Sequence, residues 1–341
     1  MTTSESAIAH KPQVTVLLAE LRGVCAGVSR AVLSVERALE KFGAPVYVRH
    51  EIVHNQYIVE SLKKRGVVFV KELDEIPNTD QPVIFSAHGV SKTVVHTAKS
   101  RGMFTIDATC PLVTRIHNDI KAYFDLGYKV LLIGHAGHPE VEGTMGQLPE
   151  GAISLIETLD DVEKLEIPAD SQVVCICQTT LSVDDASAIV SALCERFPRM
   201  VRPRGEGVCY ATTNRQEAVK LIAKQVDLFI VVGAPNSSNS QRLKETAERE
   251  GCPAFLVQYV EEIDWDSLKD VPVSRIGLSS GASTPEVLVR GVLDALSETY
   301  DVTVETVSTA TEDITFGLPK VLRGSDTLPH TCPMVSTVRP W

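Results

Sequence analysis

The stretch RGVCAGVSRAV (residues 22–32) places a cysteine between small residues, directly before a helical pattern. Two later stretches share this layout: DATCPLVTRIH (107–117) and EGVCYATTNRQ (206–216). After Cys25, Cys110 and Cys209, apolar residues recur at spacings of three and four, which is the pattern of one helix face. Each of these cysteines is therefore predicted to stand at the start of a helix.

The three cysteines divide the chain into similar lengths, with separations of 85 and 99 residues. Each predicted helix is followed by a short apolar strand and then by a polar loop, 28 or 29 residues after the cysteine. A further strand-to-loop junction follows in each part, at His88, Thr179 and Ser283. Because alternating strands and helices predict parallel sheets covered by helices, the fold class is α/β, with three similar units.

The units are expected at residues 26–109, 110–207 and 208–298, with 12–25 joining the third unit and 299–341 forming a C-terminal extension and tail. In parallel sheets the loops at the carboxyl ends of the strands gather ligands. Packing of three such units about a pseudo-threefold axis would therefore bring their functional loops to one centre.

Three thiolates at one centre suit a metal cofactor. Structural zinc usually takes four ligands, two of them close in sequence, whereas Cys25, Cys110 and Cys209 are far apart. A [4Fe–4S] cluster takes thiolates, usually four, so three ligands leave one iron open to substrate. Helix starts also favour thiolates. The sequence thus favours one iron–sulfur cluster over zinc. The remaining cysteines are interpreted as strand, packing or surface residues: 175, 177, 194, 252 and 332.

The polar loops predict a site for a diphosphate, because helix N-termini, histidines and hydroxyls bind phosphate well. The candidate residues are His54, His88, His138, Ser237, Ser238, Asn239 and Ser283. For each serine or asparagine taken alone, simple helix capping is the competing interpretation.

Glu140 follows His138 by two positions and could carry protons into the site as a general acid, with Glu142 as the rival candidate. Thr179 and Thr180 could orient that proton path. Other histidines, at positions 50, 96 and 117, are interpreted as structural, and His135 is left open because it shares the loop of His138.

The 341 residues carry a formal net charge of −11, which argues against nucleic acid or a membrane surface as a partner. No apolar run approaches the ~20 residues that a membrane span needs, and the first residues lack the pattern of a secretory signal. A cytoplasmic protein is expected, and a self-contained arrangement of three units favours a monomer.

Taken in order, the motifs RGVCAGVSRAV, IFSAHGVS, DATCPLVTRIH, GHPEVEGTMGQ, QTTLSVDD, NSSNSQRL and GASTPEVLV resemble the 4-hydroxy-3-methylbut-2-enyl diphosphate reductases. The resemblance implies a trefoil-like fold around a [4Fe–4S] cluster held by Cys25, Cys110 and Cys209. It implies that the substrate's hydroxyl binds the open iron and leaves as water. The products would be isopentenyl and dimethylallyl diphosphate, the last step of the methylerythritol phosphate route.

The same resemblance assigns the diphosphate to the histidines, serines and asparagine named above. It makes Glu140 the proton donor, assisted by Thr179, and implies electrons from a ferredoxin or flavodoxin. Glu20 and Leu21 stand where the family usually has Asn-Pro, close to Cys25. That change would affect the cluster's potential or the surface on which a reductase docks.

Two other functions use the same cysteines. An iron–sulfur hydro-lyase would need no electrons, but its small carboxylic acids would call for arginine clamps, whereas these loops carry mostly histidine, serine and asparagine. An iron or oxygen sensor would not explain Glu140 and Thr179 in matched loops, and the acidic charge speaks against an attached DNA-binding unit.

Overall fold

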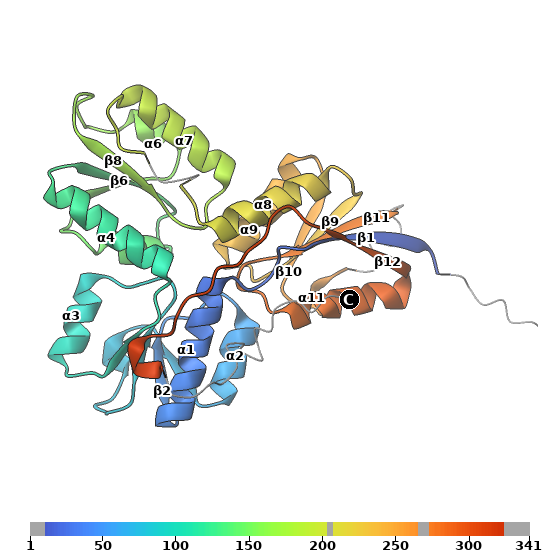
Figure 1. Cartoon of the computed structure of the whole chain (residues 1–341), viewed down its shortest axis with the longest axis horizontal. Helices are drawn as coiled ribbons and strands as arrows, with labels where there is room; N and C mark the ends of the chain where they lie inside the picture. The colour runs from blue at the N-terminus through green and yellow to red at the C-terminus, as the bar shows by residue number, and fades with distance from the viewer. Residues whose placement is uncertain (1–10, 203–206, 265–272, 324–341) are drawn as a thin grey trace, which may run out of the picture.

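The computed structural model describes residues 11–202, 207–264 and 273–323, and it contains three separate sheets whose strand pairs are all parallel (Figure 1). This agrees with the α/β class and the three similar units predicted from the sequence. Among the described residues, no helix has the length and apolar character needed to cross a membrane.

The first unit has a four-stranded sheet in the order β3-β2-β4-β5. Its strands are β2 (Val46–Arg49), β3 (Val67–Val70), β4 (Val83–Phe85) and β5 (Thr105–Asp107), and its helices are α1 (Ala26–Phe42), α2 (Gln56–Lys64) and α3 (Lys92–Ser100), with a 3₁₀ turn η1 (Leu73–Glu75). Helix α1 ends before Gly43, which has a φ of 74° and so suits glycine at that stop.

The second unit has a three-stranded sheet in the order β7-β6-β8. Its strands are β6 (Lys129–Ile133), β7 (Ile153–Ile156) and β8 (Val173–Cys177), and its helices are α4 (Pro111–Asp125), α5 (Pro139–Met145), α6 (Leu159–Glu163) and α7 (Val183–Arg196). Strand β8 is the VVCIC stretch, whose two cysteines are buried as expected for strand residues.

The third unit has a five-stranded sheet in the order β10-β9-β11-β1-β12. Its strands are β1 (Gln13–Ala19), β9 (Leu228–Val232), β10 (Ala254–Val257), β11 (Arg275–Ser280) and β12 (Asp301–Val307). Its helices are α8 (Tyr210–Ala223), α9 (Ser238–Arg249) and α11 (Glu286–Thr299), with a 3₁₀ turn η2 (Val260–Glu262). A last 3₁₀ turn, η3 (Lys320–Leu322), ends the described chain.

Strand β12 differs from the sequence expectation, which ended the third unit at residue 298. It pairs with β1 along its whole length, from Gln13 opposite Asp301 to Ala19 opposite Val307. β12 is an edge strand with no fully buried residue, so it lacks the apolar pattern that marks the interior strands. The tail from residue 325 onward lies outside the described residues.

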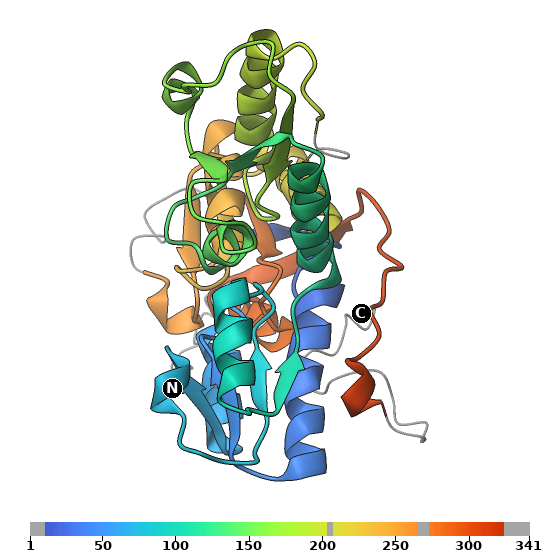
Figure 2. The ribbon, with the colours of Figure 1, turned by 90° about the vertical axis from the view of Figure 1, so that its left-hand side faces the viewer.

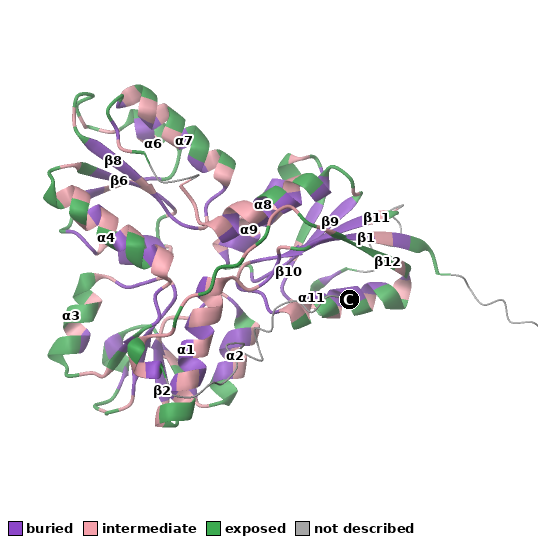
Figure 3. Ribbon diagram, viewed as in Figure 1, coloured by how far each residue is buried: buried purple, intermediate pink, exposed green. Residues whose placement is uncertain are grey.

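Each unit has its own core, formed where the buried strands meet the inner faces of the helices (Figure 3). Strand β9 is buried at all five positions, as expected for a strand covered on both sides. The green outer faces of the helices are exposed, whereas the loops at the carboxyl ends of the strands meet between the units. The fold therefore places the loops predicted to be functional around one centre.

Candidate active site

The three predicted cysteines are the N-cap residues of α1, α4 and α8, and no thiol caps its own helix. Their backbone N–H groups are held by strand-end loops in a cyclic order. Cys25 N donates to Ala282 O (3.0 Å), Cys110 N to Ala87 O (2.9 Å) and Cys209 N to Thr179 O (3.1 Å). Each cysteine thus begins one unit while bonded to the preceding unit, which is the physical basis of the pseudo-threefold pattern in the sequence.

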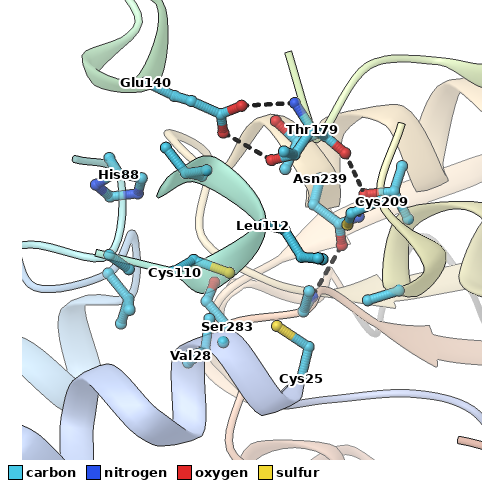
Figure 4. Close-up of a pocket in the computed structure, with 18 of the residues that line it drawn as sticks. Cys25, Val28, His88, Cys110, Leu112, Glu140, Thr179, Cys209, Asn239 and Ser283 are labelled. Atoms are coloured by element: carbon cyan, nitrogen blue, oxygen red, sulfur yellow. Dashed lines mark hydrogen bonds between the residues drawn. The ribbon is translucent and has the colours of Figure 1, made fainter. Parts of the chain in front are cut away.

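One pocket receives all three cysteines and every predicted binding residue (Figure 4). Its empty space is about 780 Å³, including the part open to solvent. The predicted residues that line it are Cys25, His54, His88, Cys110, His138, Glu140, Thr179, Thr180, Cys209, Ser237, Ser238, Asn239 and Ser283.

The space around the thiols fits a group larger than a single ion. Within the described ranges, no group of three His, Cys, Asp or Glu side chains is compact enough to hold one metal ion. Gly27 lets the sulfurs approach the start of α1 closely, since a Cβ there would stand 2.7 Å from Cys110 Sγ and 3.8 Å from Cys25 Sγ. Three thiols spread around such a space suit a multi-iron cluster better than mononuclear zinc.

Burial raises the pKa of Cys110 to about 12 and that of Cys209 to about 11, and the nearby Cys25 adds to both shifts. These thiols therefore stay protonated at neutral pH unless a cation compensates their charge. Metal ligation supplies that compensation and releases the protons.

Three histidines form a compact group on one side of the pocket. The ring centres of His54 and His88 are 4.2 Å apart and stacked, and His138 packs edge-on at 5.6 and 5.9 Å from them. Burial lowers the pKa of His138 to about 4, and the pKa of His88 falls well below its ordinary value for the same reason, with His54 and His138 adding to the shift.

The hydrogen bonds of these histidines leave ring nitrogens for a ligand. His138 Nδ1 accepts the Glu140 backbone N–H at 3.1 Å, so in the neutral ring Nε2 carries the proton and is a donor. His54 Nδ1 lies 3.1 Å from a Glu51 oxygen, while His54 Nε2 is buried with no partner in the described part of the chain. An anion in the pocket would accept the His138 Nε2–H.

Glu140 and Thr179 face each other across the second unit, from the start of α5 and the end of β8. Thr179 N donates to Glu140 Oε1 at 2.6 Å, and Thr179 Oγ1 donates to Glu140 Oε2 at 2.7 Å (Figure 4). Burial raises the pKa of Glu140 to about 7, although the two bonds from Thr179 oppose the shift. This carboxyl can therefore hold or release a proton near neutral pH.

The polar residues of the third unit are fixed by neighbours within that unit and in the other two units. Ser237 caps α9 by accepting the Ser240 N–H, and Ser238 Oγ donates to Thr180 O at 3.1 Å. Asn239 Oδ1 accepts the Ala282 N–H at 2.8 Å. Ser283 Oγ donates to His54 O at 2.9 Å. Ser237 thus caps a helix, and the other three residues bond to neighbouring loops. These bonds hold all four side chains at the pocket wall.

Residues that the sequence did not single out also build the site. Thr212 Oγ1 donates to Thr179 O at 2.9 Å and lies 3.2 Å from Cys209 Sγ. Glu51 joins the first and third units, because its carboxylate bonds both His54 and Asn236. Phe316, from the C-terminal extension, lines the pocket. Of these residues, only Thr212 could have been identified from the sequence, because it follows the predicted ligand Cys209 by three positions.

The rival candidates lie elsewhere. Glu142 is exposed and does not line the pocket. His96 is exposed on α3, and His117 is buried in α4 with Nε2 3.2 Å from Thr144 Oγ1. His135, left open from the sequence, lines a second pocket beside Arg242 instead. His50 follows β2 and is also outside the site.

In comparisons with known proteins, residues 16–297 match the family described as LytB protein. The chain belongs to the LytB family. A LytB relative from Beijerinckia indica, named 4-hydroxy-3-methylbut-2-enyl diphosphate reductase, is 54% identical over 92% of this chain and 98% of its own length. A relative of the same name from Methylocella silvestris is 55% identical over the same shares of the two chains.

Solved structures of LytB-type enzymes share the fold. The E-1-hydroxy-2-methyl-but-2-enyl-4-diphosphate reductase from Plasmodium falciparum superposes with a TM-score of 0.87 at 38% identity, covering 91% of this chain and 97% of that one. A second structure, described as the terminal enzyme of the non-mevalonate pathway, gives a TM-score of 0.59 at 32% identity, covering 84% and 100%.

Proposed function

We propose that this LytB chain reduces 4-hydroxy-3-methylbut-2-enyl diphosphate to isopentenyl and dimethylallyl diphosphate, using a [4Fe–4S] cluster held by Cys25, Cys110 and Cys209. The observation that carries the proposal is the meeting of three half-buried thiols, three histidines and a protonatable carboxyl in one pocket. The names of the relatives, at 54–55% identity over nearly their whole length, support the same reaction.

When bound, the cluster would supply electrons and an iron that carries no protein ligand. The chain itself positions the substrate. His54, His88 and His138 offer ring nitrogens to the diphosphate, and Ser237, Ser238, Asn239 and Ser283 close the pocket around it. Few lysines or arginines are needed, because neutral donors and the N-terminus of α9 bind an anion without a fixed charge.

Glu140 is proposed as the proton donor. Removing a hydroxyl as water and replacing it by hydrogen takes two electrons and two protons. A carboxyl with a pKa of about 7 is partly protonated at neutral pH, so it can give up a proton and regain it from solvent. Thr179 holds both carboxyl oxygens and thereby fixes the direction in which the proton leaves.

The electron donor is proposed to be a small carrier of the ferredoxin or flavodoxin type, and the working form a cytoplasmic monomer. Residues of all three units of the chain line the pocket.

The test is anaerobic preparation of the cluster-loaded chain, followed by an assay with 4-hydroxy-3-methylbut-2-enyl diphosphate and a chemical reductant. We expect both five-carbon diphosphate products, and none when the reductant is left out. Cluster-loaded protein that leaves the substrate unreduced would overturn the proposal. Loss of water without any added electrons would favour the hydro-lyase alternative instead.

A further inference from the structure

The residues after β12, 308–323, form a connection between the third and first units that we call the C-terminal segment. It leaves the third sheet, passes α8 and reaches α1 (Figures 1 and 2). Its end is anchored in the core of the first unit, where Leu322 is buried and Leu318 and Val321 pack alongside. Between these ends, Phe316 lines the pocket that contains the three cysteines.

Glu312 of this segment pairs with the most buried arginine of the described chain. Arg215 is 1% exposed as a whole residue, and its Nη1 donates to Glu312 Oε1 at 3.0 Å. Asn214 Nδ2 donates to the same oxygen at 3.0 Å. A buried guanidinium needs such a counter-charge, because an unpaired charge in a dry site is strongly unfavourable.

The other bonds of Arg215 go to the backbone on either side of two cysteines. Nε and Nη2 donate to Gly23 O at 3.2 and 2.9 Å, two residues before Cys25. Nη1 also donates to Ala211 O at 3.0 Å, two residues after Cys209. One side chain therefore ties the Cys25 loop, the start of α8 and the C-terminal segment together.

Arg30 repeats this arrangement at Cys110. Its Nη1 donates to Thr109 O at 2.8 Å, directly before Cys110, and its Nε donates to Gly317 O of the C-terminal segment at 2.9 Å. Arg30 follows Cys25 by five positions, and Arg215 follows Cys209 by six. Both arginines thus support the cysteine of the next unit, and both are held by the C-terminal segment.

We propose that the C-terminal segment is a clamp that retains the cluster, acting through Arg215 and Arg30 on the backbone that carries all three cysteines. Glu312 and Gly317 are its two points of attachment, and Phe316 closes the pocket between them. Arg215, Arg30 and Glu312 are positioning residues in this view, since they act through the cysteines. The inference rests on the proposed function, because it takes these cysteines to be the cluster's ligands.

The experiment compares Glu312→Gln with Asp313→Asn in the full chain. Glu312→Gln keeps an oxygen for Asn214 but removes the charge facing Arg215. Asp313→Asn removes the same charge from the next, exposed position and is the matched control. Each protein is loaded with iron and sulfide under anaerobic conditions, and the loss of cluster absorbance is followed after adding an excess of iron chelator.

We expect Glu312→Gln to lose its cluster at least about tenfold faster than wild type, since the buried Arg215 guanidinium loses its partly buried counter-charge. Asp313→Asn should lose it at the wild-type rate. Circular dichroism and denaturant unfolding of the cluster-free proteins check that the folded fraction is unchanged, so that faster loss reports on the clamp and not on global unfolding.

If Glu312→Gln does not fold, Arg30→Gln gives the second measurement, because it removes the bonds to Gly317 and Thr109 from the surface of α1 and should also speed cluster loss. Loss at the wild-type rate in a folded variant would overturn the clamp. Failure of the wild-type chain to take up any cluster would instead overturn the proposed function, so the two failures are distinguishable.

Discussion

Replacing Glu140 by glutamine tests the proton-donor assignment and its electrostatic basis together. The glutamine keeps the size of the side chain and both contacts with Thr179. Its amide oxygen accepts the Thr179 N–H, and its NH₂ donates to the Thr179 hydroxyl in place of the bonds now at 2.6 and 2.7 Å. The substitution therefore removes only the charge and the proton.

The size of the effect follows from burial. Burial raises the pKa of Glu140 from its ordinary 4.5 to about 7. At 1.36 kcal/mol per pKa unit, ionising this carboxyl costs the folded state about 3 kcal/mol. The folded chain binds the proton more tightly than the unfolded chain. Wild type therefore loses this stability as the pH rises from 4.5 through about 7, and the glutamine variant does not.

Denaturant unfolding of the cluster-free wild type and Glu140→Gln, measured from about pH 4 to pH 8, gives the difference in unfolding free energy. We expect this difference to grow in favour of the variant by about 3 kcal/mol over that range. At equal cluster content, turnover should fall by about 100-fold or more, since a general acid contributes this much. A pH-independent difference would refute the electrostatic argument, and turnover at the wild-type rate would refute the assignment.

Three other substitutions probe the pocket. Gly27→Ala would put a Cβ 2.7 Å from Cys110 Sγ, so it should block cluster loading while the cluster-free chain stays folded. The control is Gly291→Ala on α11, where an added Cβ meets open space. The measurement is the iron content of each loaded protein, and iron bound by Gly27→Ala as in wild type would contradict this prediction. Thr179→Val loses the hydroxyl bond to Glu140 but keeps the backbone bond, so kcat should fall by about tenfold with KM little changed; an altered KM alone would contradict this. His54→Asn should raise KM for the diphosphate by about tenfold, and an unchanged KM would remove His54 from the binding site.

Regular spacing made the centre of this molecule predictable. The helix-start position of the three cysteines could be read from small residues followed by apolar residues at spacings of three and four, and the structure confirms it. The sequence suggested that Thr179 orients the proton path of Glu140, because both stand in polar loops after strands. The structure adds the reason for their contact, since β6 and β8 are neighbours in one sheet and their carboxyl ends meet.

Contacts between distant segments left no such signal. Arg215 looks like one more polar helix residue, and its partner Glu312 lies 97 positions later in a segment without regular structure. Strand β12 was missed because an edge strand with exposed faces lacks a clear apolar alternation. Glu51 and Asn236 likewise meet only when the first and third units pack together.

The most direct test of the account is metal analysis of the anaerobically loaded chain and of its cysteine variants. We predict about four irons and four sulfides per wild-type chain, with one iron spectroscopically distinct in its Mössbauer spectrum because it lacks a thiolate. Cys25→Ser, Cys110→Ser and Cys209→Ser should each fail to hold the cluster, whereas Cys194→Ser should hold it as wild type does. Full cluster content in any of the first three variants, or bound zinc in place of iron, would contradict the account.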